Sequence, residues 1–359
     1  MGNECTRSGN KGEWSEVYVF FRLLGEHVIC SCDERLERTN QCYPLLKIER
    51  GKGKNSVLTY TYVEETDEWL VTDGLAKVTM VTSEESAKEA DELLELIRCE
   101  TKRTVEYPKV YKFLQRLGCD SIKAESTNKK DITLQICDIR AGHNPTCGFS
   151  IKSYLGKAPT LLNSSGECTN FLYEVRGLTV AEVVSLNSIE KTKDLMMALR
   201  NRGATLHFVD CCSDVFRKNL RYIDSSAVNI LGEMVRLYYC EDKKTIESAI
   251  ETLAEADPLH YEECGPYREM VKRLLMAVAL GMTPGKPWDG KTEVTSGFIV
   301  VKPDGDVVTY HVYNRDAFMQ YLYLCTRFEK PSRSRHHYAR LFEVDGKFYI
   351  KLALQIRFR

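Results

Sequence analysis

The sequence predicts an α/β protein in which helices flank a mixed central sheet. Helical and strand patterns alternate along the first half of the chain, and MTPGKPWDG at residues 282–290 marks a boundary by its prolines and glycines. After that boundary, FIVVKPDGDVVTYHV predicts two strands joined by a Pro-Asp-Gly turn. We therefore expect a core over residues 1–210, a helical segment over 211–290 and a C-terminal α+β region over 291–359.

Apolar periodicity predicts the elements in order. The first is a helix over residues 12–24, in which four apolar side chains recur at helical spacing: Val17, Phe20, Phe21 and Leu24. A second helix over 83–99 begins at Ser83 and carries acids in its first turn. The other expected elements are strands at 44–48, 57–63, 76–81, 204–210 and on both sides of a turn at 345–346, and helices at 110–117, 188–200, 227–237, 244–255, 267–281 and 315–325.

Composition is typical of an intracellular protein. A chain of 359 residues with 43% hydrophobic residues is long enough for one large core or two smaller ones. No apolar run approaches the roughly 20 residues needed to span a bilayer, and early polar residues argue against a signal peptide. We expect a soluble cytoplasmic protein with no membrane contact.

The fourteen cysteines are scattered, and several lie in apolar runs, where free cysteine behaves as a small hydrophobe. The close pairs are Cys30 with Cys32 and Cys211 with Cys212, and neither pair has the ligand spacing of a structural zinc site. We expect reduced thiols and no zinc.

Residues 131–153, DITLQICDIRAGHNPTCGFSIKS, contain two strand patterns joined by a loop with two glycines and a proline. Alternation puts Asp138 on the same side as Ile136 in the first strand, and Lys152 on the same side as Ser150 in the second. We expect Asp138 and Lys152 to lie side by side at one end of a sheet.

That pair of side chains suggests metal-assisted hydrolysis of a phosphodiester. Magnesium prefers oxygen ligands and keeps several waters, so Asp138 together with a substrate phosphate can hold it. Lys152 can position or deprotonate the attacking water and offset charge on the phosphorus oxygens. The alternative is a sheet edge whose charges deter aggregation.

A basic segment at residues 327–340, RFEKPSRSRHHYAR, is the best candidate for a nucleic-acid surface. The net charge of −1 excludes a general polycation but leaves such local surfaces open. Because arginine can pair with guanine through two hydrogen bonds, Arg333 and Arg335 are the first candidates for DNA contact. The further candidates are Arg327, His336, Arg340, Lys157 and Asn163. The alternatives are a solvated loop for the basic run and a turn role for the asparagine.

Four stretches spread along the chain carry a family resemblance: NKGEWSEVYVF, GFSIKSYLGKAPTLLN, TNFLYEV and KLALQIRFR. Through them the sequence resembles the HpaII-type family of type II restriction endonucleases. The resemblance implies a PD-(D/E)xK nuclease core, magnesium dependence and cleavage of double-stranded DNA at a short palindrome, which is CCGG for the family's namesake, with 5′-phosphate ends. It also implies a partner methyltransferase that protects host DNA, and a palindromic target favours a homodimer. Ser150 stands where the motif has its second acid.

Three residues are candidates to supply the missing carboxylate. Glu16 is the first and Glu13 the second, because a helix whose N-terminal acids face the active end of the sheet recurs in this nuclease core. Glu167 is the third, since some related enzymes with a Ser-x-Lys motif take an acid from a following helix. The alternative for the first two is that acids in a first turn simply complement the helix dipole.

The resulting hypothesis is a magnesium-dependent, sequence-specific endonuclease in which Asp138 binds the metal, Lys152 acts on water, Glu16 completes the site and Ser150 lies among them. The alternatives are an inactive DNA-binding protein on a nuclease scaffold and a nicking or repair nuclease. A serine hydrolase using Ser150 or Ser153 is disfavoured, because no G-x-S-x-G elbow is present.

Overall fold

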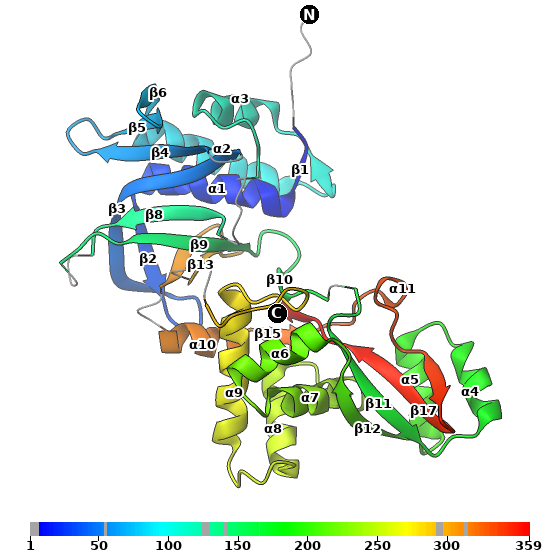
Figure 1. Ribbon diagram of the computed structural model, residues 1–359. Coiled ribbons are helices and arrows are strands. Elements are labelled where there is room, and N and C mark those ends of the chain that lie inside the picture. Colours follow the sequence, from blue (N-terminus) through cyan, green and yellow to red (C-terminus); the bar gives the residue numbers. More distant parts are fainter. Residues whose placement is uncertain are drawn as a thin grey trace, which may run out of the picture. The chain divides into compact units, whose positions relative to one another are not determined.

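The computed structural model describes residues 7–53, 56–123, 130–138, 142–164, 166–291, 297–311 and 315–359. The chain forms two compact units, which are treated separately below (Figure 1). The first consists of residues 1–159 and 293–321, and the second of residues 160–292 and 322–359.

The first unit is built on a nine-stranded mixed sheet in the order β2-β14-β13-β9-β8-β3-β4-β5-β6. Among the described strands of this sheet, only the neighbours β13–β9 and β14–β2 run parallel. The strands are β2 (Val28–Cys32), β3 (Arg38–Gly53), β4 (Ser56–Val63), β5 (Glu68–Asp73), β6 (Ala76–Thr82), β8 (Ile132–Ile136), β9 (Thr146–Ser153), β13 (Gly297–Val301) and β14 (Val307–His311).

Strand β3 is long enough to pair with strands at two places in the sheet order. Its first half pairs with β2, whereas its second half pairs with β8 and β4. Because β2 also pairs with β14, six strands from β2 round to β3 form a closed circuit of hydrogen-bonded neighbours. Strand β13 lies within the circuit and is buried on both faces, as its continuous apolar sequence GFIVV requires.

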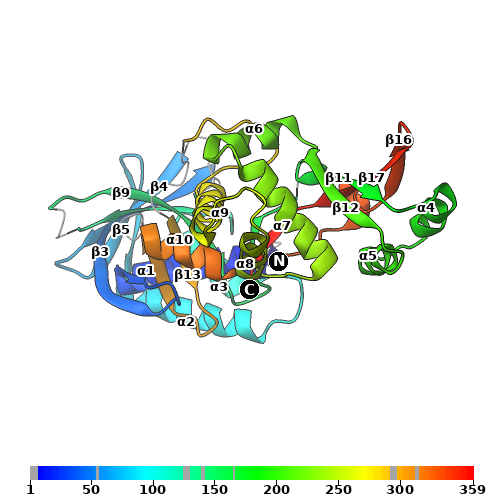
Figure 2. The ribbon, with the colours of Figure 1, turned by 90° about the horizontal axis from the view of Figure 1, so that it is seen from below.

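Helix α1 (Lys11–Glu26) carries the first of the acids predicted for the site. The Asn10 side chain caps it by accepting hydrogen bonds from the main-chain N–H groups of Gly12 and Glu13. The Glu13 carboxylate in turn accepts a hydrogen bond from Asn10 N. The helix is buried along most of its length and lies beside α2 (Ser83–Cys99) (Figures 1 and 2). Helix α3 (Pro108–Arg116) and a small sheet of β1 (Gly9–Asn10) and β7 (Thr104–Val105) complete this side.

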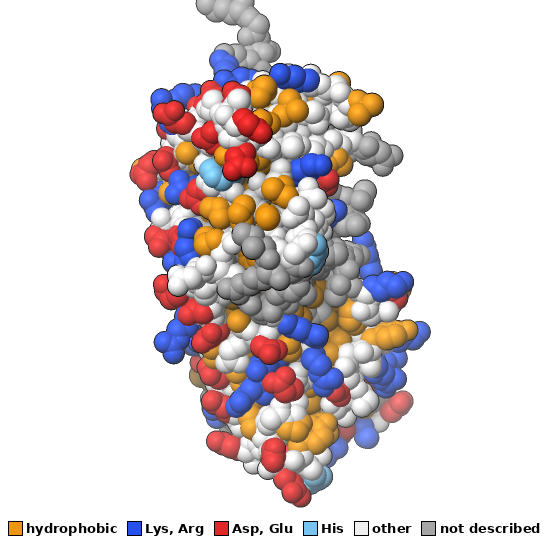
Figure 3. All heavy atoms as spheres, turned by 90° about the vertical axis from the view of Figure 1, so that its left-hand side faces the viewer, with side chains coloured by type: hydrophobic (Ala, Val, Ile, Leu, Met, Phe, Trp, Pro, Cys, Tyr) orange, Lys and Arg blue, Asp and Glu red, His pale blue; other side chains and the backbone are white. Residues whose placement is uncertain are grey.

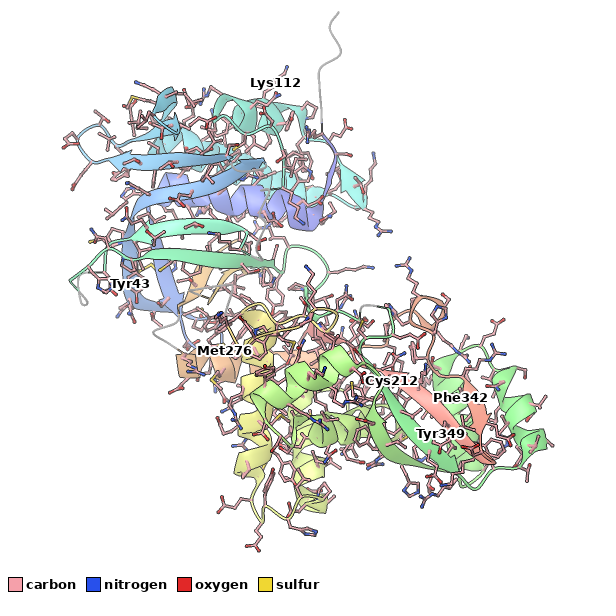
Figure 4. All side chains as sticks on the ribbon, in the orientation of Figure 1. Tyr43, Lys112, Cys212, Met276, Phe342 and Tyr349 are labelled. Carbon is pink, nitrogen blue, oxygen red and sulfur yellow. A yellow bond between two sulfur atoms is a disulfide. The ribbon has the colours of Figure 1, made fainter. Side chains whose placement is uncertain are left out.

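The second unit has its own antiparallel sheet, β12-β11-β17-β16, and a smaller one, β10-β18-β15. Cross-strand partners Phe342 and Tyr349 stack at 5.9 Å between ring centroids (Figure 4). The strands are β10 (Thr160–Leu162), β11 (Asn170–Arg176), β12 (Thr205–Cys211), β15 (Thr326–Phe328), β16 (Leu341–Val344), β17 (Lys347–Ala353) and β18 (Ile356–Phe358). The helices are α4 (Val180–Asn187), α5 (Thr192–Asn201), α6 (Asp214–Ile223), α7 (Ala227–Glu241), α8 (Ile246–Ala256), α9 (Cys264–Ala279) and the short α11 (Arg333–His336), and α10 (Arg315–Leu324) begins in the first unit.

The predicted α/β class and mixed central sheet are confirmed, and the helix over 83–99 has the expected bounds. The helix expected over 188–200 begins later, at Thr192, after a separate helix α4. No helix of the described residues combines the length and apolar character needed to cross a membrane.

The structure divides the chain differently from the expected boundaries at residues 210 and 290. Strand β12, expected in the core, pairs with β11 in the second unit. The β13–β14 hairpin, expected in a separate C-terminal region, completes the central sheet by pairing with β9 and β2. Local patterns identified these strands but did not identify their partners, which are distant in the sequence.

The expectation of reduced thiols is wrong for one pair. Cys30 and Cys42 are directly opposite each other on β2 and β3 and form a disulfide. The relevant spacing is across the strands, so the scan for close pairs along the chain missed it. Cys32, two residues from Cys30, is a free thiol that contacts the carbonyl oxygen of Thr309.

The close approach of α1 and α2 requires a glycine. A Cβ atom at Gly25 would lie 2.8 Å from backbone atoms of Ala87. We predict that Gly25→Ala lowers the free energy of unfolding by about 1–3 kcal/mol, because overpacking against backbone outweighs the better helix propensity of alanine. Denaturant unfolding measures this.

Gly265→Ala in α9 is the matched control, because the nearest atom to its added Cβ is 4.0 Å away. We expect the control to be neutral or slightly stabilising. A Gly25→Ala protein as stable as wild type would show that the helices separate without cost.

Candidate active site

The register of the β8–β9 hairpin decides which acid lies beside Lys152. Ile132 is opposite Phe149 and Gln135 is opposite Thr146, so the strands run antiparallel away from the loop. Asp138 lies at the loop, where its N–H donates to the carbonyl of His143. Lys152 lies near the other end of the hairpin, roughly 20 Å away at the rise of a strand. The predicted neighbourhood of Asp138 and Lys152 is therefore wrong.

The acid that lies beside Ser150 and Lys152 is Asp131 and not the predicted Asp138. It immediately precedes β8, and its N–H donates to the carbonyl of Phe149. Its Oδ2 accepts hydrogen bonds from Ser150 Oγ at 3.0 Å and from Ile151 N at 2.7 Å. Sequence reasoning missed it, although an antiparallel hairpin brings the start of its first strand to the end of its second.

Lys152 shares the same hydroxyl. Its Nζ donates to Ser150 Oγ at 2.9 Å and lies 5.0 Å from the centroid of the Phe298 ring. Burial lowers the pKa of Lys152, and the negative charges of Asp131 and Glu16 partly oppose this shift. An amine with a lowered pKa can exchange a proton near neutral pH more readily than an exposed lysine.

Glu16 comes to this place from α1. The pKa of Glu16 is raised to about 7, first by burial and then by the charge of Asp131, while the charges of Arg50 and Lys123 oppose this shift. Its Oε2 is buried and has no hydrogen-bond partner among the described residues. We call Glu16, Asp131, Ser150 and Lys152 the hairpin-end cluster.

Arg50 on β3 is a buried cation behind Glu16. Its guanidinium lies 5.2 Å from the centroid of Phe20, which is one helical turn beyond Glu16. It also donates to the carbonyls of Ser121 and Ile122. Arg50 is 4% exposed, so it acts as a fixed charge in the wall of the site.

The other two candidate acids have different partners. Glu13 is occupied by the N-terminal cap of α1, where its carboxylate accepts from Asn10 N at 2.8 Å. Glu167 belongs to the second unit, where it forms a 2.7 Å ion pair with Lys351.

The described residues contain no group of three or more His, Cys, Asp or Glu side chains placed to hold a metal. Two carboxylates are nevertheless sufficient for magnesium, which usually takes one or two protein carboxylates and retains waters. The unpartnered Oε2 of Glu16 and the carboxylate of Asp131 are oxygen donors of the kind that a hard dication prefers. The hairpin-end cluster therefore suits magnesium better than zinc.

The predicted DNA-contacting residues of the basic segment differ in how many hydrogen bonds they form within the protein. Arg333 donates to three main-chain carbonyls, those of Ile189, Glu190 and Ala339, which gives it a structural role. Arg335 and Arg340 are exposed, and no hydrogen bond or ion pair within the described chain engages either guanidinium.

The remaining candidates are mixed. His336 Nδ1 lies 2.8 Å from the carbonyl of Gly166, and Arg327 is 4.0 Å from the Glu329 carboxylate. Lys157 and Asn163 are both exposed. On the face drawn in Figure 3, basic and acidic side chains are interspersed, in keeping with a net charge near zero.

A mixed α/β core that brings Asp131 and Lys152 of a hairpin together with Glu16 of α1 has side chains suited to the hydrolysis of a phosphodiester. Comparison with known proteins agrees with this chemistry. The chain matches the HpaII restriction endonuclease family over residues 10–358, and it belongs to that family. It is 36% identical over 354 residues to the type II restriction enzyme HpaII of Haemophilus parainfluenzae, covering 98% of each chain.

The protein is therefore a type II site-specific deoxyribonuclease of a restriction-modification system, and its substrate is double-stranded DNA. No solved structure matches the chain.

The raised pKa of Glu16 makes stability depend on pH. The ordinary value is 4.5 and the folded value about 7, so the ionised carboxylate disfavours the folded state, and stability decreases as pH rises from 4.5 to 7. We predict that Glu16→Gln stabilises the protein at pH 8 in chelator, by about 2 kcal/mol. Urea unfolding at pH 8 and pH 5 measures the difference, which should shrink at pH 5.

Glu84→Gln, at an exposed position in the first turn of α2, is the control and should bring no gain at pH 8. A Glu16→Gln protein that is no more stable than wild type at pH 8 would contradict the claim that the ionised Glu16 carboxylate destabilises the folded state.

Proposed function

We propose that the protein cleaves double-stranded DNA at a specific site with magnesium, and that the hairpin-end cluster is its catalytic site on a PD-(D/E)xK-like core. The observation that carries the proposal is the joint attachment of Asp131 and Lys152 to Ser150 Oγ, beside the buried carboxylate of Glu16. An acid, a lysine and an unpartnered carboxylate oxygen at one place suit phosphodiester hydrolysis.

Asp131 and Glu16 would hold the magnesium ion, and the ion would offset charge on the scissile phosphate and lower the pKa of a water. The fit rests on Glu16 Oε2, which is buried without a partner in the described chain. A dication would replace the missing interaction and favour the ionised carboxylate. Ionisation of Glu16 would then accompany metal binding and release a proton near neutral pH.

The role of Lys152 follows from its surroundings. Its lowered pKa suits it to orient the attacking water or to take a proton from it. Ser150 fixes the ammonium by its hydroxyl and also fixes Asp131, so it orients both groups. The acid that the PD-(D/E)xK motif has at this position is thus replaced by a hydroxyl, and α1 supplies a carboxylate instead.

The target we propose is a short G·C-rich palindrome, with CCGG as the first candidate, cleaved to leave 5′-phosphate ends. Membership of the HpaII family supports this. A palindrome has two-fold symmetry, so a homodimer would place one hairpin-end cluster on each strand. A methyltransferase of the same specificity would protect the host DNA.

Exposed arginines of the basic segment are the proposed DNA contacts. Arg335 and Arg340 have no partner within the described chain, whereas Arg333 is held by main-chain carbonyls. We therefore favour Arg335 and Arg340, with Lys157, Asn163, Arg327 and His336 as further candidates.

The catalytic assignment predicts a contrast between two aspartates. Asp131→Asn and Lys152→Ala should each lower cleavage of plasmid DNA at least about 100-fold with magnesium. Asp138→Asn should keep most of the activity, because Asp138 lies at the loop end of the hairpin. Mapping of fragment ends after digestion of a plasmid measures all three.

Each alternative has its own outcome. Retained binding with no fragments from the wild-type protein would identify an inactive DNA-binding protein, and single-strand breaks would identify a nicking nuclease. Loss of cutting in Asp138→Asn together with full cutting in Asp131→Asn would overturn the site.

The arginine assignment predicts a change in salt dependence. The double variant Arg335→Ala/Arg340→Ala should bind DNA more weakly. The slope of log K against log salt should become less steep by roughly 1–2, because fewer phosphate contacts form and fewer counterions are released on binding. Arg176→Ala is the control, since Arg176 pairs with Glu174 at 2.9 Å. An unchanged slope in the double variant would remove both arginines from the interface.

A further inference from the structure

The end of β9 and the first turns of α1 are joined by a pair of serine hydroxyls. Ser153 Oγ donates to Ser15 Oγ at 2.9 Å. Ser15 follows the capped N-terminus of α1 and directly precedes Glu16, while Ser153 directly follows Lys152. The bond therefore links the two segments that carry the second acid and the lysine of the hairpin-end cluster.

We propose that the Ser15–Ser153 hydrogen bond is a positioning device that fixes Glu16 relative to Lys152. The proposal rests on the proposed catalytic site. Neither serine is assigned a chemical step: each acts through its neighbour in the sequence.

The directions of the hydrogen bonds form one consistent chain. Leu155 N donates to Ser153 Oγ at 3.2 Å, Ser153 Oγ donates to Ser15 Oγ, and Ser15 Oγ donates to the carbonyl of Lys11 at 2.7 Å. Each hydroxyl gives its single hydrogen and accepts one bond. The order of donors is thereby fixed, and rotation of either hydroxyl breaks at least one of these bonds.

Burial makes this chain costly to break. Ser15 is 0% exposed, so water does not replace Ser153 as the donor to its hydroxyl, which would keep only its bond to the Lys11 carbonyl. The apolar side chains of α1 also pack in the core, but hydrophobic contact is non-directional and does not by itself specify a distance between two chosen groups. A hydrogen bond restricts that separation because it depends on distance and angle.

Both partners are themselves held in place. Ser153 lies opposite Val301 in the parallel β9–β13 pair, and the next residue, Tyr154, donates its N–H to the carbonyl of Val301. Ser15 is on the helix that Asn10 caps. The hydrogen bond between the two serines thus connects α1 to β9. Its loss would allow the distance between Glu16 and Lys152 to change.

The test uses Ser153→Ala, Ser15→Ala and the double variant in the full-length protein, with Ser86→Ala as the matched control. Ser86 is also 0% exposed and donates to a carbonyl four residues earlier, at Thr82, but it lies on α2. Single-turnover cleavage of plasmid DNA is measured over a range of magnesium concentrations, together with DNA binding in calcium and thermal unfolding.

We expect each single variant to cut about 10-fold more slowly, in line with the cost of a small misplacement of catalytic groups. The magnesium concentration for half-maximal rate should rise several-fold, while DNA affinity stays at the wild-type value. The double variant should be no slower than the slower single variant, because both substitutions remove the same bond. Ser86→Ala should cut at the wild-type rate.

Wild-type rates and magnesium dependence in both single variants would overturn the inference, as would losses that simply add in the double variant or an equal loss in Ser86→Ala. Lys152→Ala, tested in parallel, separates this failure from failure of the site. If Lys152→Ala cuts normally, the proposed catalytic site is wrong, whereas an inactive Lys152→Ala with normal serine variants removes only the positioning role.

Discussion

The hydroxyl of Ser150 is the interaction on which the candidate site depends. It donates to Asp131 Oδ2 and accepts from Lys152 Nζ, so one small side chain joins the acid before β8 to the lysine of β9. The antiparallel register makes this meeting possible, because it returns the end of β9 to the start of β8. Any slip of one residue would turn Ser150 and Lys152 to the other face of the sheet and separate both from Asp131.

The second constraint is the cost of burying charge. Burial acts on Glu16 and Lys152 in opposite directions: it raises the pKa of the acid and lowers the pKa of the lysine, so it disfavours the charged form of each group. Arg50 and Lys123 limit the shift of Glu16 from one side, and Asp131 increases it from the other. A dication among these groups would restore the charged carboxylate, which links metal binding to proton release and to stability.

Local patterns were sufficient for part of this arrangement. The apolar stripe of the first helix correctly indicated α1, and alternation placed Ser150 and Lys152 on one face. The choice of Glu16 depends on the family resemblance, and its role stays a prediction. The prediction of Asp138 instead of Asp131 requires the C-terminal ends of the two strands to meet, whereas in the antiparallel hairpin the end of the first strand faces the start of the second. Local patterns do not predict which distant strands pair. Examples are the parallel pairing of β9 with β13 and the disulfide between Cys30 and Cys42.

The serine in place of an acid has an electrostatic rationale. An acid at position 150 would bring a third carboxylate next to Asp131 and Glu16, and like charges in a partly buried place disfavour one another. With serine there, the hairpin-end cluster holds two carboxylates, the number that magnesium usually takes from a protein. The hydroxyl also supplies a donor that a carboxylate lacks, and Asp131 uses that donor. In the proposed site, a second acid supplied by α1 instead of the strand would keep the number of carboxylates at two. It would also make the distance between helix and strand a determinant of the site, and Ser15 and Ser153 span that distance.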